Sequence, residues 1–333
     1  MLDLHGQKIL FIAPNFFGYE NQIINALKTA GATVSYYQEN IDSTDFFQKL
    51  INQLPNSFRE NERSRHFISI FSKEKLEEYN YVFCIRIDLF NETILRFLKD
   101  NCKKALFILY YWDSVVNMRN ADVNAAYFDK VFTFDLNDYR ERKTKGWKFR
   151  PLFFIDAFRN IRSNEKKDID LLFVASLSSA RSELYNKLEA LCEINHLNMF
   201  AYFYMKPYVW FVNRRKVDSY KTLSHKLVHG NAIPTDYLCS LIQRSRVIVD
   251  CPSPSQSGLT MRTIECFGAN KKMLTTNRTL FEYDFYNSNN HLIVEEFKDR
   301  DILTFIKDEK YIYPDQCLYY KYSLNGWIED IFI

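Results

Sequence analysis

Glycine is scarce in this sequence, with eight residues among 333, and no low-complexity segment or short-period repeat interrupts the chain. The positions of the few glycines are therefore informative, and two of them, Gly258 and Gly268, stand ten residues apart. Cysteine is also sparse. The seven cysteines are scattered without any Cys-x-x-Cys pair, which argues against a disulfide framework or a zinc site and favours a reducing compartment.

The sequence lacks both a charge excess and a long apolar run. Its 44 basic and 41 acidic side chains leave a net charge of +3, too balanced for a typical nucleic-acid-binding protein. No run approaches the roughly 18 apolar residues of a membrane span, and the first apolar run is too short for a signal peptide. We therefore expect a cytoplasmic protein, either free or peripheral on the inner face of the plasma membrane.

Short apolar runs bounded by turn residues predict strands that are buried on both faces. Between them lie stretches with helical spacing, such as 20–30, which Gly31 closes. This alternation is typical of an α/β fold with parallel sheets and right-handed connections. The predicted strands of the first half are 8–14, 32–38, 79–86, 104–114, 129–135 and 149–155. Residues 41–80 read as two helical pieces, broken near Pro55.

A second series begins after the charged stretch 158–168, which we interpret as a linker. The domains are then 1–157 and 169–315, followed by a closing segment, 316–333, that ends in an amphipathic helix. The predicted strands of the second half are 169–178, 197–204, 246–252 and 272–277, and its predicted helices include 179–195 and 233–245.

The loop after the predicted strand 246–252 has the features of a phosphate site. Two prolines and Gly258 force a turn there, and a helix should begin near Leu259 or Thr260. In a parallel α/β sheet such a loop lies at the carboxyl edge, where ligands bind. The helix start offers unpaired N–H groups and a positive dipole end, both of which suit phosphate.

Two charged residues follow on that helix. The guanidinium of Arg262 suits a pair of pyrophosphate oxygens, and the carboxylate of Glu265 can accept hydrogen bonds from vicinal ribose hydroxyls. The alternative is an exposed i,i+3 ion pair, which is common and contributes only about 0.2–0.5 kcal/mol. The glycine spacing and the strand-edge position favour a binding site for a nucleoside diphosphate.

The segment QSGLTMRTIECFGANKKMLTTN (256–277) resembles the sugar-nucleotide motif of GT-B glycosyltransferases. It is most similar to bacterial enzymes that build lipopolysaccharide, capsule or other surface glycans. Residues 233–277 resemble their C-terminal domain, and LYYWDSVVNMRN…FDKVFTFDLNDY (109–139) resembles the end of their N-terminal domain. The resemblance implies two Rossmann-like domains facing across a cleft, with the C-terminal helix closing back.

By this resemblance, the C-terminal domain binds the donor and the N-terminal domain binds the acceptor. The glutamate at the position of Glu265 would hold the donor ribose, and the turn after the first strand of that domain would meet the diphosphate. The serines of that turn have helix capping as an alternative role. The predicted donor-binding residues are Ser176, Ser178, Arg181, Gln256, Gly258, Leu259, Thr260, Arg262 and Glu265.

Transfer with inversion needs a base that deprotonates the acceptor hydroxyl. Asp113, at the end of a buried strand, is the first candidate, with helix capping as its alternative role; Glu20 and Asp88 follow. Gly18 and Trp112 are predicted on the acceptor side. Many retaining members of the resembled group carry a second glutamate where this chain has Ser257, and we therefore favour inversion.

The predicted reaction is transfer of a sugar from a UDP or GDP donor to a glycan or a lipid-linked acceptor, without a metal or another cofactor. The pair Asp168-x-Asp170 precedes a strand instead of following one, which argues against a metal site. Two alternatives remain: transfer of a polyol phosphate from a CDP donor, and a non-catalytic protein that binds nucleotide sugars. The aromatic and basic stretch 202–217 is either a membrane contact or a buried strand followed by a basic loop.

Overall fold

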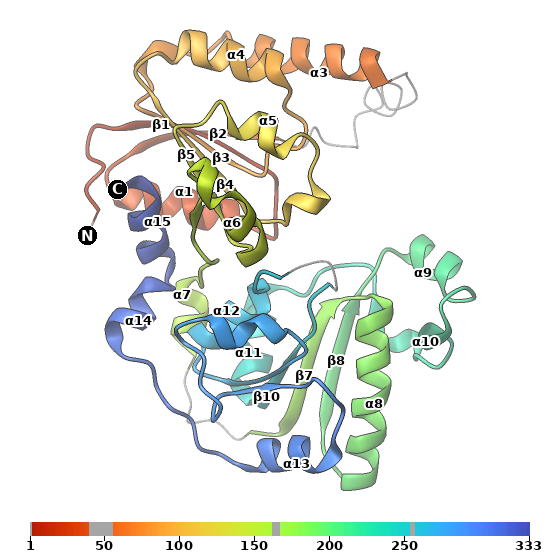
Figure 1. Cartoon of the computed structure of the whole chain (residues 1–333). Coiled ribbons are helices and arrows are strands. Elements are labelled where there is room, and N and C mark those ends of the chain that lie inside the picture. Colours follow the sequence, from red (N-terminus) through yellow and green to blue (C-terminus); the bar gives the residue numbers. More distant parts are fainter. Residues whose placement is uncertain (1, 40–55, 162–166, 254–256) are drawn as a thin grey trace. The chain divides into compact units, whose positions relative to one another are not determined.

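The structure, a computed structural model, describes residues 2–39, 56–161, 167–253 and 257–333 (Figure 1). The chain divides into two compact units, of which unit 1 comprises Met1–Pro151 with Asn325–Ile333 and unit 2 comprises Leu152–Leu324. The division falls ahead of the predicted linker 158–168, of which residues 162–166 lie outside the described residues. Each unit contains a six-stranded sheet with parallel pairing, which confirms the predicted α/β class with two Rossmann-like domains.

In unit 1 the strand order is β2-β1-β3-β4-β5-β6, so the direction of winding reverses between β1 and β3. The strands are β1 (Lys8–Ala13), β2 (Thr33–Gln38), β3 (Tyr81–Ile85), β4 (Leu106–Tyr111), β5 (Lys130–Thr133) and β6 (Lys148–Phe149). The helices are α1 (Tyr19–Thr29), α3 (Asn56–Phe71), α4 (Glu92–Asn101), α5 (Ala121–Ala125), α6 (Leu136–Arg142) and α15 (Leu324–Phe332).

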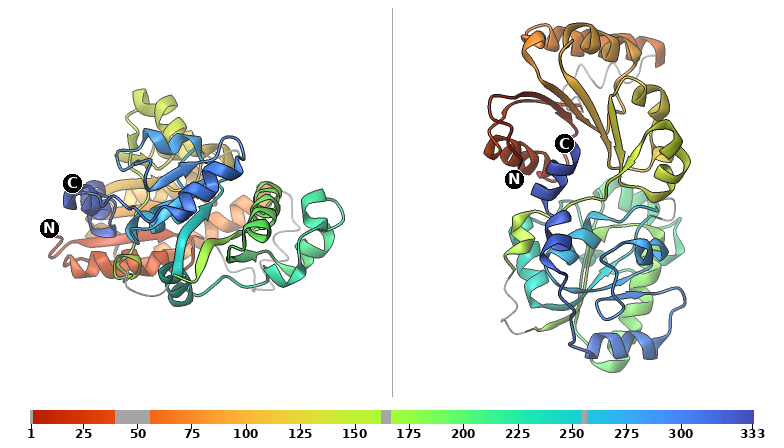
Figure 2. Two further views of the ribbon diagram at one scale, coloured as in Figure 1. Left: turned by 90° about the horizontal axis from the view of Figure 1, so that it is seen from below. Right: turned by 60° about the vertical axis from the view of Figure 1, so that its left-hand side comes forward.

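Helices cover both faces of this sheet. The buried side chains of α3, α4 and α5 form one cluster with alternate residues of the strands, such as Val82 and Leu109. On the other face α15 returns from the end of the chain, and Trp327 packs against Tyr110 with ring centroids 4.8 Å apart. The predicted closing helix is therefore present, and the structure shows that it packs on unit 1 (Figures 1 and 2).

The sixth predicted strand, 149–155, is wrong in its extent, because β6 covers only Lys148–Phe149. Pro151 has no N–H group with which to continue the ladder. The apolar run beyond it belongs to unit 2, where Phe154 forms an isolated parallel bridge with Ser323. The apolar run 149–155 is therefore not one strand: its first residues belong to unit 1, and the residues after Pro151 belong to unit 2.

In unit 2 the strand order is β12-β11-β10-β7-β8-β9, which reverses between β7 and β10. The strands are β7 (Ile169–Ser176), β8 (Met199–Tyr204), β9 (Val228–His229), β10 (Ser245–Asp250), β11 (Lys272–Thr275) and β12 (His291–Ile293). The sequence did not predict β9 and β12, because strands of two or three residues have too little periodicity to detect.

Helices α8 and α13 cover one face of this sheet, where they bury Leu188 and Ile302 against Phe173 and Val247. Helices α11 and α12 cover the other face (Figure 1). The helices are α7 (Asp156–Arg159), α8 (Ser179–Asn195), α9 (Pro207–Asn213), α10 (Asp218–Lys221), α11 (Thr235–Arg244), α12 (Met261–Gly268), α13 (Asp299–Lys307) and α14 (Gln316–Lys321). None of the helices in the described part of the chain combines the length and the apolarity that a membrane crossing requires.

Candidate active site

The carboxylate of Asp250, the last residue of β10, anchors the start of α12. Asp250 is 4% exposed and accepts hydrogen bonds from Thr260 Oγ1 at 2.8 Å and Thr263 Oγ1 at 3.1 Å. Thr275 Oγ1, at the end of β11, donates to the same carboxylate at 3.3 Å. Thr260 also caps the helix, since its Oγ1 accepts from Thr263 N. The helix start is therefore fixed to the carboxyl ends of two strands.

Arg262 and Glu265 form an ion pair on α12, with Nη1 donating to Oε2 at 2.5 Å. The alternative interpretation was an exposed i,i+3 ion pair. The spacing is indeed i,i+3, but the pair is not exposed, because the side chains of Arg262 and Glu265 are only 17% and 7% accessible. Nε of Arg262 is buried and has no hydrogen-bond partner among the described residues. A guanidinium that binds a carboxylate in this way keeps the carboxylate oriented.

The loop that leads into α12 is tied to the segment after β11. Thr279 Oγ1 donates to the carbonyl of Ser257 at 2.6 Å, and Asn277 Nδ2 donates to that of Gly258 at 3.4 Å. Leu259 is 1% exposed, so its side chain belongs to the core and only its backbone is left for a ligand. Gln256 lies outside the described residues.

Arg181 spans the point where the winding of the unit 2 sheet reverses. Its Nε donates to the carbonyl of Cys251 and its Nη1 to that of Ser176, both at 2.7 Å. The guanidinium thus joins the carboxyl ends of β10 and β7, at the crevice where open α/β sheets bind ligands. Ser178 caps α8 by accepting from Arg181 N at 3.3 Å, which is the capping role expected as its alternative.

Gly268, the last residue of α12, permits close packing at the opposite end of the helix. A Cβ atom at this position would lie 2.5 Å from Phe154 Cγ, well inside contact distance. The hydroxyl of Tyr319 also donates to the carbonyl of Gly268. The glycine is therefore required by packing, whereas Gly18 is required by its backbone angle.

In unit 1, Arg86 follows β3 and holds two of the predicted catalytic carboxylates. Its Nε donates to Asp88 Oδ2 at 2.9 Å, and its Nη1 lies 3.3 Å from Asp113 Oδ2. Asp113 Oδ1 accepts from Ser114 N at 2.9 Å and from Asn117 Nδ2 at 3.0 Å, but the N-cap of the short helical turn that follows is Ser114, so Asp113 does not have the capping role expected as its alternative. Both carboxylates lie at the carboxyl edge of the sheet, a position that the sequence predicted for Asp113 alone.

Asp88 differs from Asp113 in its second oxygen. Asp88 Oδ1 is buried, and the described residues provide no hydrogen-bond partner for it. Burial raises the pKa of Asp88, although the charge of Arg86 opposes this. An unpaired buried acceptor costs free energy that a ligand hydroxyl would recover.

Sequence reasoning missed Glu39 and Arg86. Glu39 follows β2, is 1% exposed and accepts a hydrogen bond from Leu89 N. Burial raises the pKa of Glu39 to about 8; the carboxylate of Asp88 adds to the increase, and Arg86 opposes it. The available signal was positional, since both residues directly follow strands of the parallel sheet.

The other predicted residues of unit 1 gather around the loop after β1. Glu20 is 5% exposed, and its Oε2 accepts from Phe16 N at 3.1 Å, which closes the loop. Trp112 is 9% exposed and packs against the ring of Phe16, with centroids 4.8 Å apart. Gly18 has a φ of 81°, and a Cβ atom added to it would meet nothing within 4 Å, which fits the alternative of a plain turn.

Asp168 and Asp170 each have an arginine partner. Asp168 binds Arg244 through both oxygens, at 2.9 and 2.5 Å, and Asp170 lies 3.2 Å from Arg246. Within the described ranges no group of three or more His, Cys, Asp and Glu side chains is arranged to hold a metal ion.

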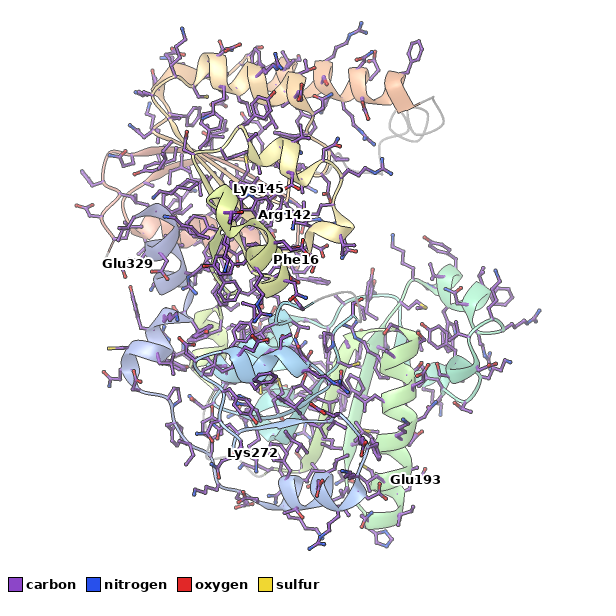
Figure 3. All side chains as sticks on the ribbon, viewed as in Figure 1. Phe16, Arg142, Lys145, Glu193, Lys272 and Glu329 are labelled. Carbon is purple, nitrogen blue, oxygen red and sulfur yellow. The ribbon has the colours of Figure 1, made fainter. Side chains whose placement is uncertain are left out.

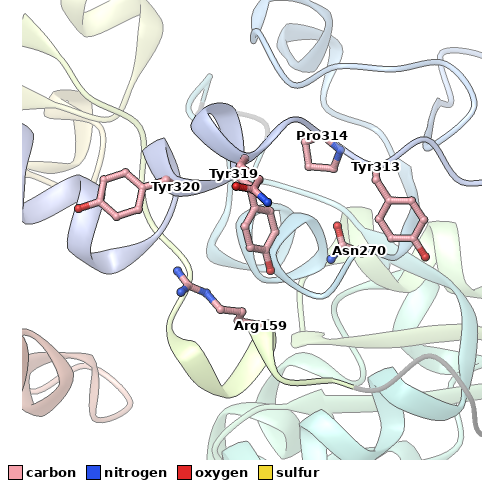
Figure 4. A pocket seen from close by; sticks show the side chains of 7 residues that line it. Arg159, Asn270, Tyr313, Pro314, Tyr319 and Tyr320 are labelled. Atoms are coloured by element: carbon pink, nitrogen blue, oxygen red, sulfur yellow. The ribbon is translucent and has the colours of Figure 1, made fainter.

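A cavity of about 550 Å³ lies beyond the C-terminal end of α12 (Figure 4). Figure 4 shows Tyr319 between Arg159 and Asn270 in this view, and the guanidinium carbon of Arg159 lies 5.8 Å from the ring centroid of Tyr319. Asn270 precedes β11, so the cavity opens at the amino edge of the sheet. The starts of α8 and α12, which carry Arg181 and Thr260, lie at the other, carboxyl edge.

No protein-family model matches this sequence, and no curated protein sequence matches it either. Solved structures do match over nearly the full length. A glycosyltransferase from Rickettsia africae aligns with a TM-score of 0.59 at 12% identity, covering 97% of this chain and 96% of its own. An α,α-trehalose-phosphate synthase (UDP-forming) from Burkholderia xenovorans, in complex with glucose-6-phosphate, aligns with a TM-score of 0.63 at 8% identity, covering 97% and 99%.

The chain has the GT-B fold. The S. aureus protein MnaA, in a co-structure with UDP, also aligns, with a TM-score of 0.55 at 12% identity over 98% of this chain and 95% of its own. Identities this low show the GT-B fold alone, and the same fold carries different reactions. The activity must therefore be argued from the side chains of the site.

Proposed function

We propose that this protein is a glycosyltransferase that uses a nucleoside-diphosphate sugar, with UDP or GDP as the leaving group. The observation that carries the proposal is the buried Arg262–Glu265 pair on a helix whose start Asp250 fixes at the carboxyl edge of the unit 2 sheet. On a GT-B fold, this edge offers helix N–H groups for a diphosphate and an oriented carboxylate for a ribose.

The diphosphate is proposed to bind between the starts of α8 and α12. The N-terminus of α12 and the guanidinium of Arg181 contribute positive potential there, and this supports stabilisation of the leaving group without a divalent cation. Arg262 is proposed to orient Glu265, because its Nη1 is already engaged by that carboxylate.

In the proposed reaction, an acceptor hydroxyl oxygen attacks the anomeric carbon and its proton passes to a carboxylate of unit 1. The bond from the anomeric carbon to the phosphate oxygen breaks, and the nucleoside diphosphate leaves. Asp88 is the preferred base, ahead of Asp113, because it has a raised pKa and a buried oxygen without a partner in the described part. We propose inversion at the anomeric carbon.

The proposed acceptor is a glycan or a lipid-linked sugar of a bacterial surface polysaccharide, reached from the cytoplasmic side. The resemblance of residues 233–277 and 109–139 to enzymes of that class supports this choice. A lipid-linked acceptor would require the protein to work at a membrane surface.

The direct test of the donor site compares UDP with 2′,3′-dideoxy-UDP by calorimetry, for the wild type and for Glu265→Gln. If Glu265 holds the ribose hydroxyls, the substitution weakens UDP binding roughly 10- to 100-fold, as expected for hydrogen bonds to a charged group, and leaves dideoxy-UDP binding unchanged. Glu193→Gln is the matched control, since Glu193 is exposed near the C-terminal end of α8 in the same unit (Figure 3).

Turnover then distinguishes the reactions that one fold can carry. Transfer of sugar from a UDP- or GDP-linked donor to an added acceptor supports the proposal. Binding without turnover indicates a nucleotide-sugar-binding protein, and a preference for CDP-linked donors indicates polyol-phosphate transfer. Conversion of the donor sugar without any acceptor would contradict transfer; one structurally similar protein is a putative UDP-N-acetylglucosamine 2-epimerase from Listeria monocytogenes.

A further inference from the structure

Helix α9 of unit 2 presents an apolar face to solvent. Tyr208, Phe211 and Val212 stand at i, i+3 and i+4, so they share one side of the helix, and they are 68%, 73% and 51% exposed. Trp210, on the other side, packs against Tyr220 with ring centroids 5.5 Å apart. The helix therefore uses one face to attach itself to unit 2 and leaves an equally apolar face uncovered.

The segment that carries this face is strongly basic. Residues 206–229 contain six lysines and arginines and one acidic residue, a net charge of +5, whereas the whole chain has +3. The remaining residues therefore sum to −2. All six cationic side chains are exposed, and the one acid, Asp218, is paired with Lys221 at 2.6 Å. The basic residues are Lys206, Arg214, Arg215, Lys216, Lys221 and Lys226.

The segment is held against the rest of unit 2 and does not hang free. Ser182 Oγ of α8 lies 2.6 Å from Ser219 Oγ, and Asn186 Nδ2 donates to Thr222 Oγ1 at 2.9 Å. Figures 1 and 2 both show α9 and α10 beyond α8, at the rim of unit 2. An apolar patch surrounded by basic side chains, on a segment attached to the domain, has the features of an interfacial membrane contact.

We propose that the face formed by Tyr208, Phe211 and Val212, together with Arg214, Arg215 and Lys216, docks on an anionic lipid surface. Aromatic rings insert at the level of the headgroups, and each nearby cation adds attraction to acidic lipids. A neutral protein groove would cover the apolar side chains but would leave this concentration of positive charge unpaired. Charge complementarity therefore favours the lipid surface as the occupant.

The position of the face also fits the candidate donor site. Helix α9 follows the carboxyl end of β8, while the start of α8 with Arg181 and the loop with Gly258 follow the carboxyl ends of β7 and β10. Neighbouring parallel strands end at one edge, so the docking face and the donor loops share the carboxyl edge of this sheet. This step rests on the proposed function: membrane docking would bring a lipid-linked acceptor to the edge that holds the donor.

The test is cosedimentation of the full chain with vesicles of phosphatidylcholine that contain 0, 10 or 30% phosphatidylglycerol. We expect binding that requires phosphatidylglycerol and weakens with salt. Arg214→Gln/Arg215→Gln should weaken it roughly thirtyfold, at about fivefold per charge. Lys103→Gln/Lys104→Gln, which removes two charges from the surface of unit 1, should leave it unchanged.

Phe211→Ser should weaken binding roughly tenfold, and Ile194→Ser, at an equally exposed residue of α8, should not.

UDP binding is measured on the same samples by thermal shift, so that loss of docking and loss of the donor site are read separately. Equal losses for the Arg214/Arg215 and Lys103/Lys104 variants would overturn the proposal, as would absence of binding to 30% phosphatidylglycerol at low salt. Dimers that Phe211→Ser dissociates, without vesicle binding, would show that the face is a protein interface instead.

Discussion

Thr260 Oγ1 donates to Asp250 Oδ1 at 2.8 Å, and this bond links the cap of α12 to the end of β10. A buried carboxylate that accepts from three hydroxyls is well satisfied, and it fixes the residues that carry them. The three hydroxyls come from different places: two from the start of α12 and one from β11. Their removal should therefore have different effects on stability and on donor binding.

Thr263→Val and Thr275→Val form a matched pair that tests this separation. Both residues are fully buried and both hydroxyls bind Asp250 Oδ2, so each change should lower the free energy of unfolding by about 1–3 kcal/mol. Only Thr263 lies on α12, so only its variant should also weaken UDP binding. Urea unfolding and calorimetry measure the two effects, and equal UDP affinities in both variants would show that the helix start does not position the donor.

In the buried Arg262–Glu265 pair, removing one charge should destabilise the protein more than removing both charges. Arg262→Met leaves the carboxylate of Glu265 without its guanidinium and should cost about 3–5 kcal/mol of unfolding free energy. Arg262→Met/Glu265→Met removes both charges, and it should be more stable than Arg262→Met alone. Denaturant unfolding of the two single variants and the double variant measures the coupling. Additive losses would indicate that the two side chains act independently.

Asp88→Asn should lower kcat by about 10²–10⁴-fold and leave the donor KM nearly unchanged, if Asp88 is the general base. Asp113→Asn and Glu20→Gln serve as comparisons, because the same change of charge is made at carboxylates that already accept local hydrogen bonds. Steady-state kinetics with a soluble acceptor distinguishes them. A larger loss of kcat in Asp113→Asn than in Asp88→Asn would reverse the assignment.

Much of the fold could be predicted because a parallel strand that is buried on both faces appears in the sequence as a continuous apolar run. The helix 179–195 followed from the serine-rich turn before it, and the start of α12 followed from the proline and glycine turn. The edge strands β9 and β12 could not be found, since they are too short to show a period. The run 149–155 was wrongly predicted as one strand, because the hydrophobicity of a residue does not show which of two cores it belongs to.

The candidate site was only partly predictable for a related reason. Glu265 and Arg262 stood out because they follow a glycine turn, and Arg181 because it follows a serine turn. Asp250 did not, since an aspartate at the end of a strand is unremarkable until three threonines converge on it. Glu39 and Arg86 are distant in sequence from Asp113, and only the order of the strands brings them to one edge.

Glu39 gives unit 1 a pH dependence with a definite sign. Its carboxyl ionises near pH 4.5 in the unfolded chain, and burial raises its pKa to about 8 in the folded protein. Between these values the folded state holds one more proton than the unfolded state. The free energy of unfolding should therefore fall as the pH rises through this window, on the order of 1 kcal/mol per pH unit.

Glu39→Gln removes the titrating group and keeps an oxygen that can accept from Leu89 N. The variant should lose less stability than the wild type between pH 5 and pH 8, and the difference between the two should grow with pH in favour of the variant. Urea unfolding at constant ionic strength measures this difference. The contributions of other carboxyls with raised pKa values, such as Asp88, are present in both proteins and therefore largely cancel. Glu92→Gln, at an exposed glutamate of α4, is the control and should follow the wild type. Parallel stability curves for Glu39→Gln and the wild type would mean that Glu39 is already ionised in the folded protein at neutral pH. The carboxyl edge of unit 1 would then carry one more negative charge than the burial of this carboxyl implies.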